Sequence, residues 1–277
     1  MRKRSLPWWA TAVLAIDRAF ERARDLEKQV RDELFLSFGR ERAEDITIAI
    51  YDRNEEYRPG GKRDPFVGLH DWEAKLVHDR RFPTTGRLLV GAAGGGREIA
   101  VLTRLGYHVD AFEPSPSLFA SAEEVARRSG RARVARGTYA ELCDAVDGRG
   151  PLADLVAAGR YDAVMLGWGS YSHVLDRAQR VALLRAVARL TRGPLVVSFE
   201  VRRPPMRRTD RMPRLVQNAA RAFGRGAPPP ELVFYGNVGF LASFDRQMLE
   251  GEAADAGWTV STFAETPYGY ALLTRSA

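Results

Sequence analysis

Cysteine is almost absent from this sequence, since Cys143 is the only one among 277 residues. An intramolecular disulfide and a multi-thiolate metal site are therefore excluded, and neither is needed in a reducing compartment. We expect a cytoplasmic protein without a bound metal. Hydrophobic residues make up 45% of the chain, which is enough to bury a full α/β core.

The sequence also lacks an apolar run long enough to cross a membrane. The N-terminal stretch from Leu6 to Ile16 has eleven residues, and Asp17 begins a dense mixture of charges after it. A helical span needs about 20 apolar residues. No small-residue cleavage site follows this stretch, so it does not complete a signal peptide. We expect neither a membrane span nor a cleaved leader.

The N-terminal segment instead has the periodicity of an amphipathic helix that ends near Phe38. Its apolar face consists of Val13, Ile16, Phe20, Ala23, Val30 and Leu34. We interpret the segment as a helix that docks on the rest of the chain. Two alternatives stay open. One is an anchor on a membrane surface that uses Trp8, Trp9 and the basic residues 2–4. The other is a helix that joins two copies in a homodimer.

Acidic residues are scarce between Arg202 and Arg225, where eight arginines accompany one acid, Asp210. The net charge of +7 in these 24 residues equals the formal excess of the whole chain. Such a patch is typical of sites for nucleic acid, acidic lipid or an anionic substrate. Because Phe223 is its only aromatic residue, we expect a mostly solvated helix and no specific nucleic-acid binding. We assign this insertion, at about 202–230, to a substrate lid with one or two arginines facing an acidic acceptor.

What the sequence does contain is a dense glycine loop between two short apolar runs. Leu88 to Val90 are typical of a parallel strand buried on both faces, and this run ends at Gly91. Residues 92–96 then let the backbone turn sharply and approach a ligand. A helix from Arg97 to Leu105 follows. A second strand ends at Glu113, whose carboxylate can accept both hydroxyls of a ribose.

This stretch resembles motif I and the following acidic motif of the class I S-adenosylmethionine-dependent methyltransferases. Ala92, Gly94 and Gly96 stand at the three glycine positions of that motif, and Val90 stands where an acid is common. The resemblance implies S-adenosylmethionine as cofactor. It also implies a doubly wound, mostly parallel α/β sheet of seven strands, with the last strand antiparallel and inserted between strands five and six. The dinucleotide pattern G-x-G-x-x-G does not fit residues 91–99.

The rest of the chain has elements in the order that this fold requires. We expect further strands at 133–137, 161–166, 194–199, 258–263 and 269–274, and helices at 117–128 and 177–190. A methyltransferase domain would then cover residues 85–277, after a helical extension and lid at 1–84. Within that extension residues 46–52 fit a strand or a helix equally well.

The resemblance also implies which residues contact the cofactor. They belong to the glycine loop, to the ends of the second, third and fourth strands, and to a tyrosine-bearing lid. The residues are Gly91, Ala92, Gly94, Gly96, Glu113, Thr138, Tyr139, Gly167, Trp168, Tyr51 and Tyr57. For the two lid tyrosines, ordinary packing stays an alternative.

The segment after the fourth strand contains our candidate for a general base, His173, because imidazole titrates near neutrality. A role in capping or packing is the alternative. Methyl transfer from a sulfonium needs alignment rather than a nucleophilic side chain. The segment lacks the [DN]-P-P-[YF] pattern of many amino methyltransferases, and Gly167 stands where polyamine synthases carry an aspartate. We expect methyl transfer to a small molecule, with an RNA methyltransferase and a non-catalytic cofactor-fold protein as alternatives.

Overall fold

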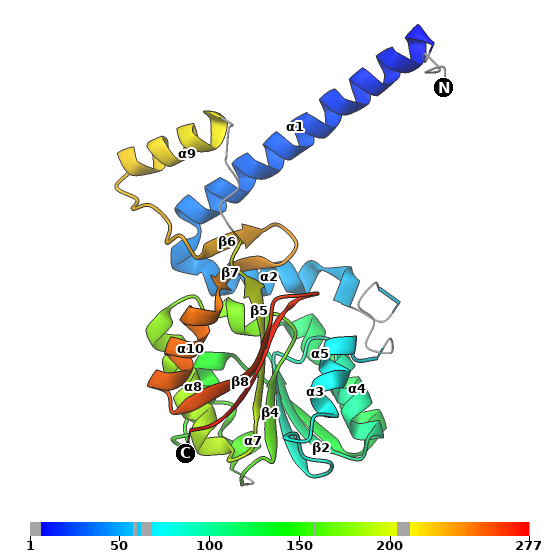
Figure 1. The fold of residues 1–277 in the computed structure, drawn as a ribbon, viewed down its shortest axis with the longest axis vertical. Coiled ribbons are helices and arrows are strands. Elements are labelled where there is room, and N and C mark those ends of the chain that lie inside the picture. Colours follow the sequence, from blue (N-terminus) through cyan, green and yellow to red (C-terminus); the bar gives the residue numbers. More distant parts are fainter. Residues whose placement is uncertain (1–6, 58–59, 62–67, 158, 204–210, 277) are drawn as a thin grey trace.

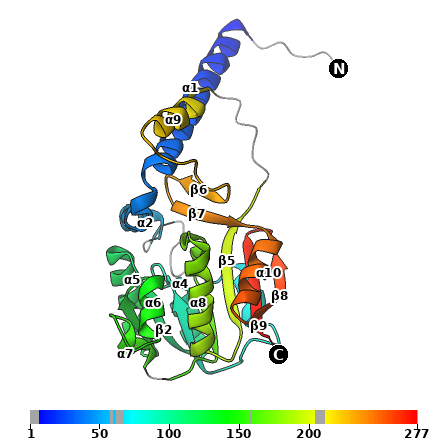
Figure 2. The same ribbon diagram turned by 90° about the vertical axis from the view of Figure 1, so that its left-hand side faces the viewer.

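A computed structural model of the chain describes residues 7–57, 60–61, 68–157, 159–203 and 211–276, with the side chains of 211–214 not included. Helices cover both faces of a central sheet, and a smaller group of elements lies beyond one end of the strands (Figures 1 and 2). No helix of the described ranges combines the length and apolarity needed to cross a membrane.

The central sheet has the strand order β3-β2-β1-β4-β5-β9-β8. The first five of these strands are parallel, and β9 is antiparallel to both of its neighbours. This arrangement confirms the predicted seven-stranded, doubly wound sheet. The bounds are β1 (Arg87–Gly91), β2 (His108–Glu113), β3 (Ala132–Arg136), β4 (Ala163–Leu166), β5 (Leu195–Val201), β8 (Trp258–Ala264) and β9 (Gly269–Arg275).

The core lies in two apolar clusters, one on each face of the sheet. Strand β1 supplies both, because Leu89 belongs to one cluster and Leu88 and Val90 to the other. All three are fully buried, which explains their continuous apolar run. Helices α3 (Asp71–Val77), α4 (Arg97–Arg104) and α5 (Pro116–Ser129) contribute to one cluster, and α6 (Tyr139–Ala145), α7 (Ala153–Val156), α8 (Arg177–Leu190) and α10 (Arg246–Asp255) to the other.

Two features beyond the strand ends could not be predicted from the sequence: one was left undecided and the other was missed. Residues 46–52 belong to a helix, α2 (Ala43–Arg53), between the short 3-10 helices η1 (Arg40–Arg42) and η2 (Glu55–Tyr57). A hairpin of β6 (Leu232–Tyr235) and β7 (Gly239–Phe244) was not predicted, and β7 pairs with the end of β5. Its two apolar runs flank Gly236 and Asn237, a turn pair that indicates a hairpin.

The N-terminal helix α1 (Trp8–Phe38) docks only through its last turns. There Leu36 is buried beside the hairpin, and Phe35 stacks on Phe234 with ring centroids 4.3 Å apart. Earlier in the helix, Trp9 and Phe20 are 58% and 62% exposed. The predicted docking is therefore confined to the C-terminal part of α1, and the remainder projects away from the sheet (Figure 1).

The described part of the arginine-rich insertion forms α9 (Arg211–Ala222), which lies beside α1 (Figures 1 and 2). After this helix, Arg225 pairs with Glu41. The guanidinium of Arg40 donates to the carbonyl oxygens of Gly226 and Ala227. These bonds attach the insertion to the N-terminal elements. Residues 204–210 lie outside the described ranges.

Candidate functional site

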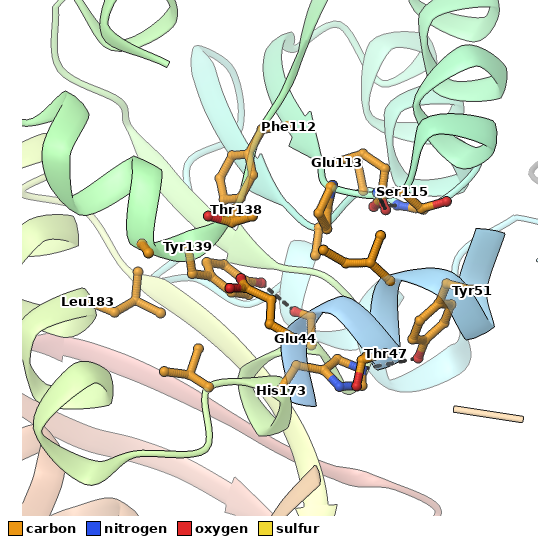
Figure 3. Close-up of a pocket in the computed structure, with 18 of the residues that line it drawn as sticks. Glu44, Thr47, Tyr51, Phe112, Glu113, Ser115, Thr138, Tyr139, His173 and Leu183 are labelled. Atoms are coloured by element: carbon orange, nitrogen blue, oxygen red, sulfur yellow. Dashed lines mark hydrogen bonds between the residues drawn. The ribbon is translucent and has the colours of Figure 1, made fainter. Parts of the chain in front are cut away.

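A cavity of about 650 Å³ is lined by residues that follow β1, β2, β3 and β4. From β1 the chain adds β2 and β3 on one side and β4 and β5 on the other, so the strand order reverses between β1 and β4. Ligands of doubly wound sheets bind at such a point. Small-molecule sites generally measure roughly 300–1,000 Å³. The position and the size of the cavity are therefore those of a cofactor and substrate site (Figure 3).

The glycine loop forms one wall of this cavity. Ala92 and Gly94 line it, with positive φ angles of 52° and 55°. A Cβ atom added to Gly94 would meet no protein atom within 4 Å, so a larger side chain there would occupy the cavity. At Gly95 an added Cβ would lie 2.6 Å from the carbonyl oxygen of Tyr57. The loop thus leaves room for a ligand and packs tightly against the N-terminal extension.

Glu113 ends β2 and is only 4% exposed. The amide of Gly94 donates to Oε2 at 2.8 Å, and the amide of Ser115 donates to Oε1 at 2.9 Å. Burial raises the pKa of Glu113 to about 7, although the two amide donors act in the opposite direction. A carboxylate has about four acceptor positions. Two positions therefore remain for hydroxyl donors of a ligand.

The wall beyond β3 and β4 contains Thr138, Tyr139 and Trp168. Thr138 caps α6, because its hydroxyl accepts from the amide of Glu141 while its own amide donates to the Glu141 carboxylate. The hydroxyl of Tyr139 lies 2.6 Å from that of Ser170. Two predicted residues are thus held by bonds that the protein makes without a ligand.

Helix α2 closes another side of the cavity, and we call it the roof (Figure 3). Thr47 accepts a hydrogen bond from the amide of Phe240 at 3.1 Å. Asp52 accepts from the amide of Ser117 at 2.8 Å and from the hydroxyl of Ser115 at 3.1 Å. The roof is therefore attached to β7 on one side and to the start of α5 on the other. The roof residues on the cavity wall are Ala43, Glu44, Thr47, Ile48 and Tyr51.

The candidate base His173 lies on the cavity wall and hydrogen-bonds through both ring nitrogens. Nδ1 is 2.9 Å from the carbonyl oxygen of Phe240, and Nε2 is 3.1 Å from the hydroxyl of Tyr51. A carbonyl only accepts, so Nδ1 carries the proton and Nε2 accepts from Tyr51. Burial lowers the pKa of His173 to about 4, so the ring is neutral at physiological pH. Any proton that reaches Nε2 along this bond passes through the Tyr51 oxygen.

Among the described residues of the cavity wall, carboxylates outnumber guanidinium groups. Of the two arginines, Arg97 is bound to Glu73 and Glu98, and Arg40 is bound to main-chain carbonyls. The pKa of Glu44 is raised by burial and by neighbouring carboxylates. Among the acids, Glu41 pairs with Arg225, Glu98 with Arg97 and Asp144 with Arg149, so the negative charge of the described wall comes mainly from Glu44, Asp176 and ionised Glu113. The acids of the wall are Glu41, Glu44, Glu98, Glu113, Asp144 and Asp176.

Most of the predicted site residues meet on this wall: Tyr51, Tyr57, Ala92, Gly94, Glu113, Thr138, Tyr139, Trp168 and His173. Gly91, Gly96 and Gly167 do not line the cavity. An added Cβ at Gly167 would lie 2.4 Å from the carbonyl oxygen of Ala92, and Gly96 caps α4 with a φ of 95°. These glycines serve the backbone geometry that the loop needs. Their contact with a cofactor stays a prediction.

The expected arginine-rich lid does not form from the residues that the structure describes. None of residues 202–203 or 215–230 lines the cavity, because α9 packs beside α1 instead. Arg207 and Arg208 lie outside the described ranges. The sequence also did not reveal the roof residues Glu44 and Thr47. Thr47 and Tyr51 are four residues apart. If residues 46–52 had been assigned to a helix, this spacing would have placed both side chains on one face.

Among solved structures, the chain is similar to the sugar N-methyltransferase KedS8 from Streptoalloteichus sp ATCC 53650. The identity is 19%, the alignment covers 79% of this chain and 90% of that chain, and the TM-score is 0.51. It is also similar to the SAM-bound amino pentose methyltransferase CalS10 from Micromonospora echinaspora, at 18% identity, 76% and 94% coverage and a TM-score of 0.50. Neither a scan against protein-family models nor a search of curated proteins found a match. At these identities the likeness establishes the fold.

Proposed function

We propose that this chain, which has the class I methyltransferase fold, is an S-adenosylmethionine-dependent methyltransferase that acts on a small, amine-bearing molecule. The observation that carries the proposal is the cavity at the strand-order reversal, where the open side of Gly94 faces a ligand space beside Glu113. When bound, the cofactor supplies an electrophilic methyl group on a sulfonium sulfur. The protein has to bind, orient and exclude water.

The wall residues fit this cofactor in chemistry as well as in space. Glu113 retains acceptor positions for the two hydroxyls of a ribose, and Gly94 leaves the loop open to the adjoining chain of the cofactor. Thr138 and Tyr139 would border the adenine, with Tyr57 and Trp168 beside the amino acid portion. A sulfonium carries positive charge, which suits a wall rich in carboxylates.

The negative wall favours a cationic acceptor over an anionic one. Alkyl amines are mostly protonated in water, and carboxylates such as Glu44 attract them. The two similar structures are named as methyltransferases of a sugar nitrogen and of an amino pentose, which is related acceptor chemistry. The acidic acceptor expected from the arginine-rich insertion finds no support in its described residues. A nucleic-acid acceptor is disfavoured because its phosphates would be repelled by the same wall.

Tyr51 and His173 supply a path for the proton that the acceptor nitrogen loses. In this path the Tyr51 oxygen takes the proton from the acceptor while its own hydroxyl proton moves to Nε2 of His173. The bond from Nδ1 to Phe240 fixes the tautomer that leaves Nε2 free to accept. Burial keeps the imidazole of His173 neutral and so able to accept, while the same lowered pKa makes Nε2 a weak base that holds the proton only in passing.

Isothermal calorimetry with S-adenosylhomocysteine tests the proposal. The wild type should bind, and Gly94→Leu should weaken binding by more than about tenfold, or ~1.4 kcal/mol, because the side chain would fill the ligand space. Gly148→Leu is a matched control, because Gly148 also has a positive φ, 75°, and open surroundings but lies outside the cavity wall. Absence of binding, or equal loss in both variants, would favour a non-catalytic protein with this fold.

A further inference from the structure

The N-terminal two thirds of α1 exposes a row of large apolar side chains. Trp9, Val13, Ile16 and Phe20 are 57–62% exposed, and residues 11–28 are exposed on every side of the helix. Figure 1 shows this part projecting away from the sheet and the hairpin. Helices of this kind usually gain their stability from packing an apolar face rather than from helix propensity. A further partner is therefore expected to cover it.

The spacing of this apolar row is that of a coiled-coil seam. Its members recur at alternating intervals of four and three residues, interrupted once at Glu27, which gives a period of 3.5 rather than 3.6. A seam of this period packs against another helix of the same period. We refer to it below as the α1 seam: Trp9, Val13, Ile16, Phe20, Ala23, Val30 and Leu34.

Charged residues flank the exposed seam on one side only. Asp17 and Arg24 occupy one flank, whereas Ala12, Ala19 and Leu26 occupy the equivalent positions of the other. In a parallel pair of identical helices the two unlike flanks meet, so both charges would face apolar residues. In an antiparallel pair each flank meets its own copy. Asp17 then lies opposite Arg24 of the second copy, and the twofold axis repeats this pair.

We propose that a second copy of this chain covers the α1 seam, with the two helices antiparallel and related by a twofold axis near residues 21 and 22. The same register sets Phe20 opposite the small Ala23 of the second copy, so that large and small side chains interdigitate. Overlap from Trp9 to Leu34 makes a helix pair about 39 Å long at 1.5 Å per residue. This assembly is independent of the proposed methyl transfer.

The charge of the projecting helix favours a protein partner over a membrane surface. Between Trp8 and Arg31 the sequence has four acidic and five basic residues, and the acids are spread among the bases. A helix that lies on anionic lipid normally has a polar face rich in lysine and arginine. A nearly neutral helix with one charged flank suits self-pairing instead.

Light scattering coupled to size-exclusion chromatography, run over a concentration series, tests the pairing. The wild type should elute as a dimer, and Phe20→Glu should be a monomer that keeps the circular dichroism spectrum of a folded chain, because the Phe20 side chain is 62% exposed in the single chain. Asp17→Arg and Arg24→Asp should each weaken the dimer at least tenfold. Combined in one chain, the two changes should restore it, because the pair re-forms with its charges exchanged.

Arg18→Asp combined with Asp25→Arg is the matched control, since these residues lie on the face opposite the seam. That double variant and its single changes should leave the dimer unaffected. A wild-type monomer at all concentrations, a dimer that survives Phe20→Glu, or failure of the exchanged pair to restore the dimer would overturn the proposal. So would a monomer that cosediments with vesicles of phosphatidylglycerol and phosphatidylcholine through Phe20.

Discussion

At the scale of single residues, Glu113 should make ligand binding depend on pH near neutrality. Burial raises its pKa to about 7, so its ionised fraction grows between about pH 6 and pH 8. Ligand hydroxyls bind the ionised carboxylate better, and the affinity for S-adenosylhomocysteine should rise up to about tenfold over this range. Glu113→Gln should bind more weakly by about 1.5–3 kcal/mol and without this pH dependence. Calorimetry at both pH values measures these effects.

The same carboxylate should influence stability without a ligand. Folded protein holds the proton on Glu113 up to about pH 7, whereas the ordinary pKa is 4.5. The folded state therefore binds more protons between these values, and the free energy of unfolding falls as pH rises. Denaturant unfolding at pH 5 and pH 7 should give a larger fall in the wild type than in Glu113→Gln. Equal falls would contradict a raised pKa.

Tyr51 and His173 should act as one unit in turnover. Tyr51→Phe removes the hydroxyl that joins the acceptor to Nε2, and His173→Gln removes the proton acceptor. Each should lower kcat roughly 100-fold, and the double variant should lose little more, because both changes interrupt one path. Tyr107→Phe is the control, since that hydroxyl binds a main-chain carbonyl outside the cavity wall. Full activity of Tyr51→Phe would exclude the path.

At the scale of elements, the sheet could be predicted and the roof could not. Buried parallel strands have continuous apolar runs, such as Leu88 to Val90, that periodicity detects directly. Residues 46–52 could not be assigned to a helix or a strand from the sequence, because their helix is half-buried and is fixed by distant partners such as Phe240. The hairpin that provides Phe240 was also missed. The glycine loop and Glu113 were local in sequence, whereas Glu44 and Thr47 reach the cavity only through tertiary contacts.

The roof should loosen as a unit when its attachment to α5 is removed. Asp52→Ala loses the bonds to Ser115 and Ser117, each worth about 1.5–3 kcal/mol as a charge-assisted bond. Amide hydrogen exchange should speed up in α2 while the strands of the sheet keep their protection. Asp45→Ala provides the comparison, because Asp45 forms an ion pair with the exposed Arg42 at the start of the same helix. Protection of α2 that is identical in the two variants would show that the bonds of Asp52 do not hold it.

At the scale of the whole molecule, the N-terminal extension should be inseparable from the sheet. Trp72, Leu76 and Phe82 are at most 3% exposed and complete one core cluster, and Glu73 neutralises the buried Arg97. Each apolar side chain contributes about 1.5–3 kcal/mol, which together approaches the net stability of a typical domain, about 5–15 kcal/mol. A chain that begins at residue 85 should therefore fail to fold, as judged by near-ultraviolet circular dichroism.

A shorter truncation provides the contrast. Removal of residues 1–28 deletes the exposed part of α1 but keeps the turns that contact the hairpin. That chain should match the melting temperature of the monomeric Phe20→Glu variant within a few degrees. If the chain from residue 85 folds equally well, the extension is a separate unit after all.

The roof should also affect how long a ligand stays bound in the cavity. It is held at Thr47 by β7 and at Asp52 by α5, and the main chain of Tyr57 rests against Gly95. These attachments fix one side of the cavity, so we expect a molecule bound below the roof to leave faster when they open. Residence in the cavity is then governed by the opening frequency of the protein as well as by the contacts of the molecule itself. We expect departure of the demethylated product, rather than the bond-making step, to set the pace of repeated turnover.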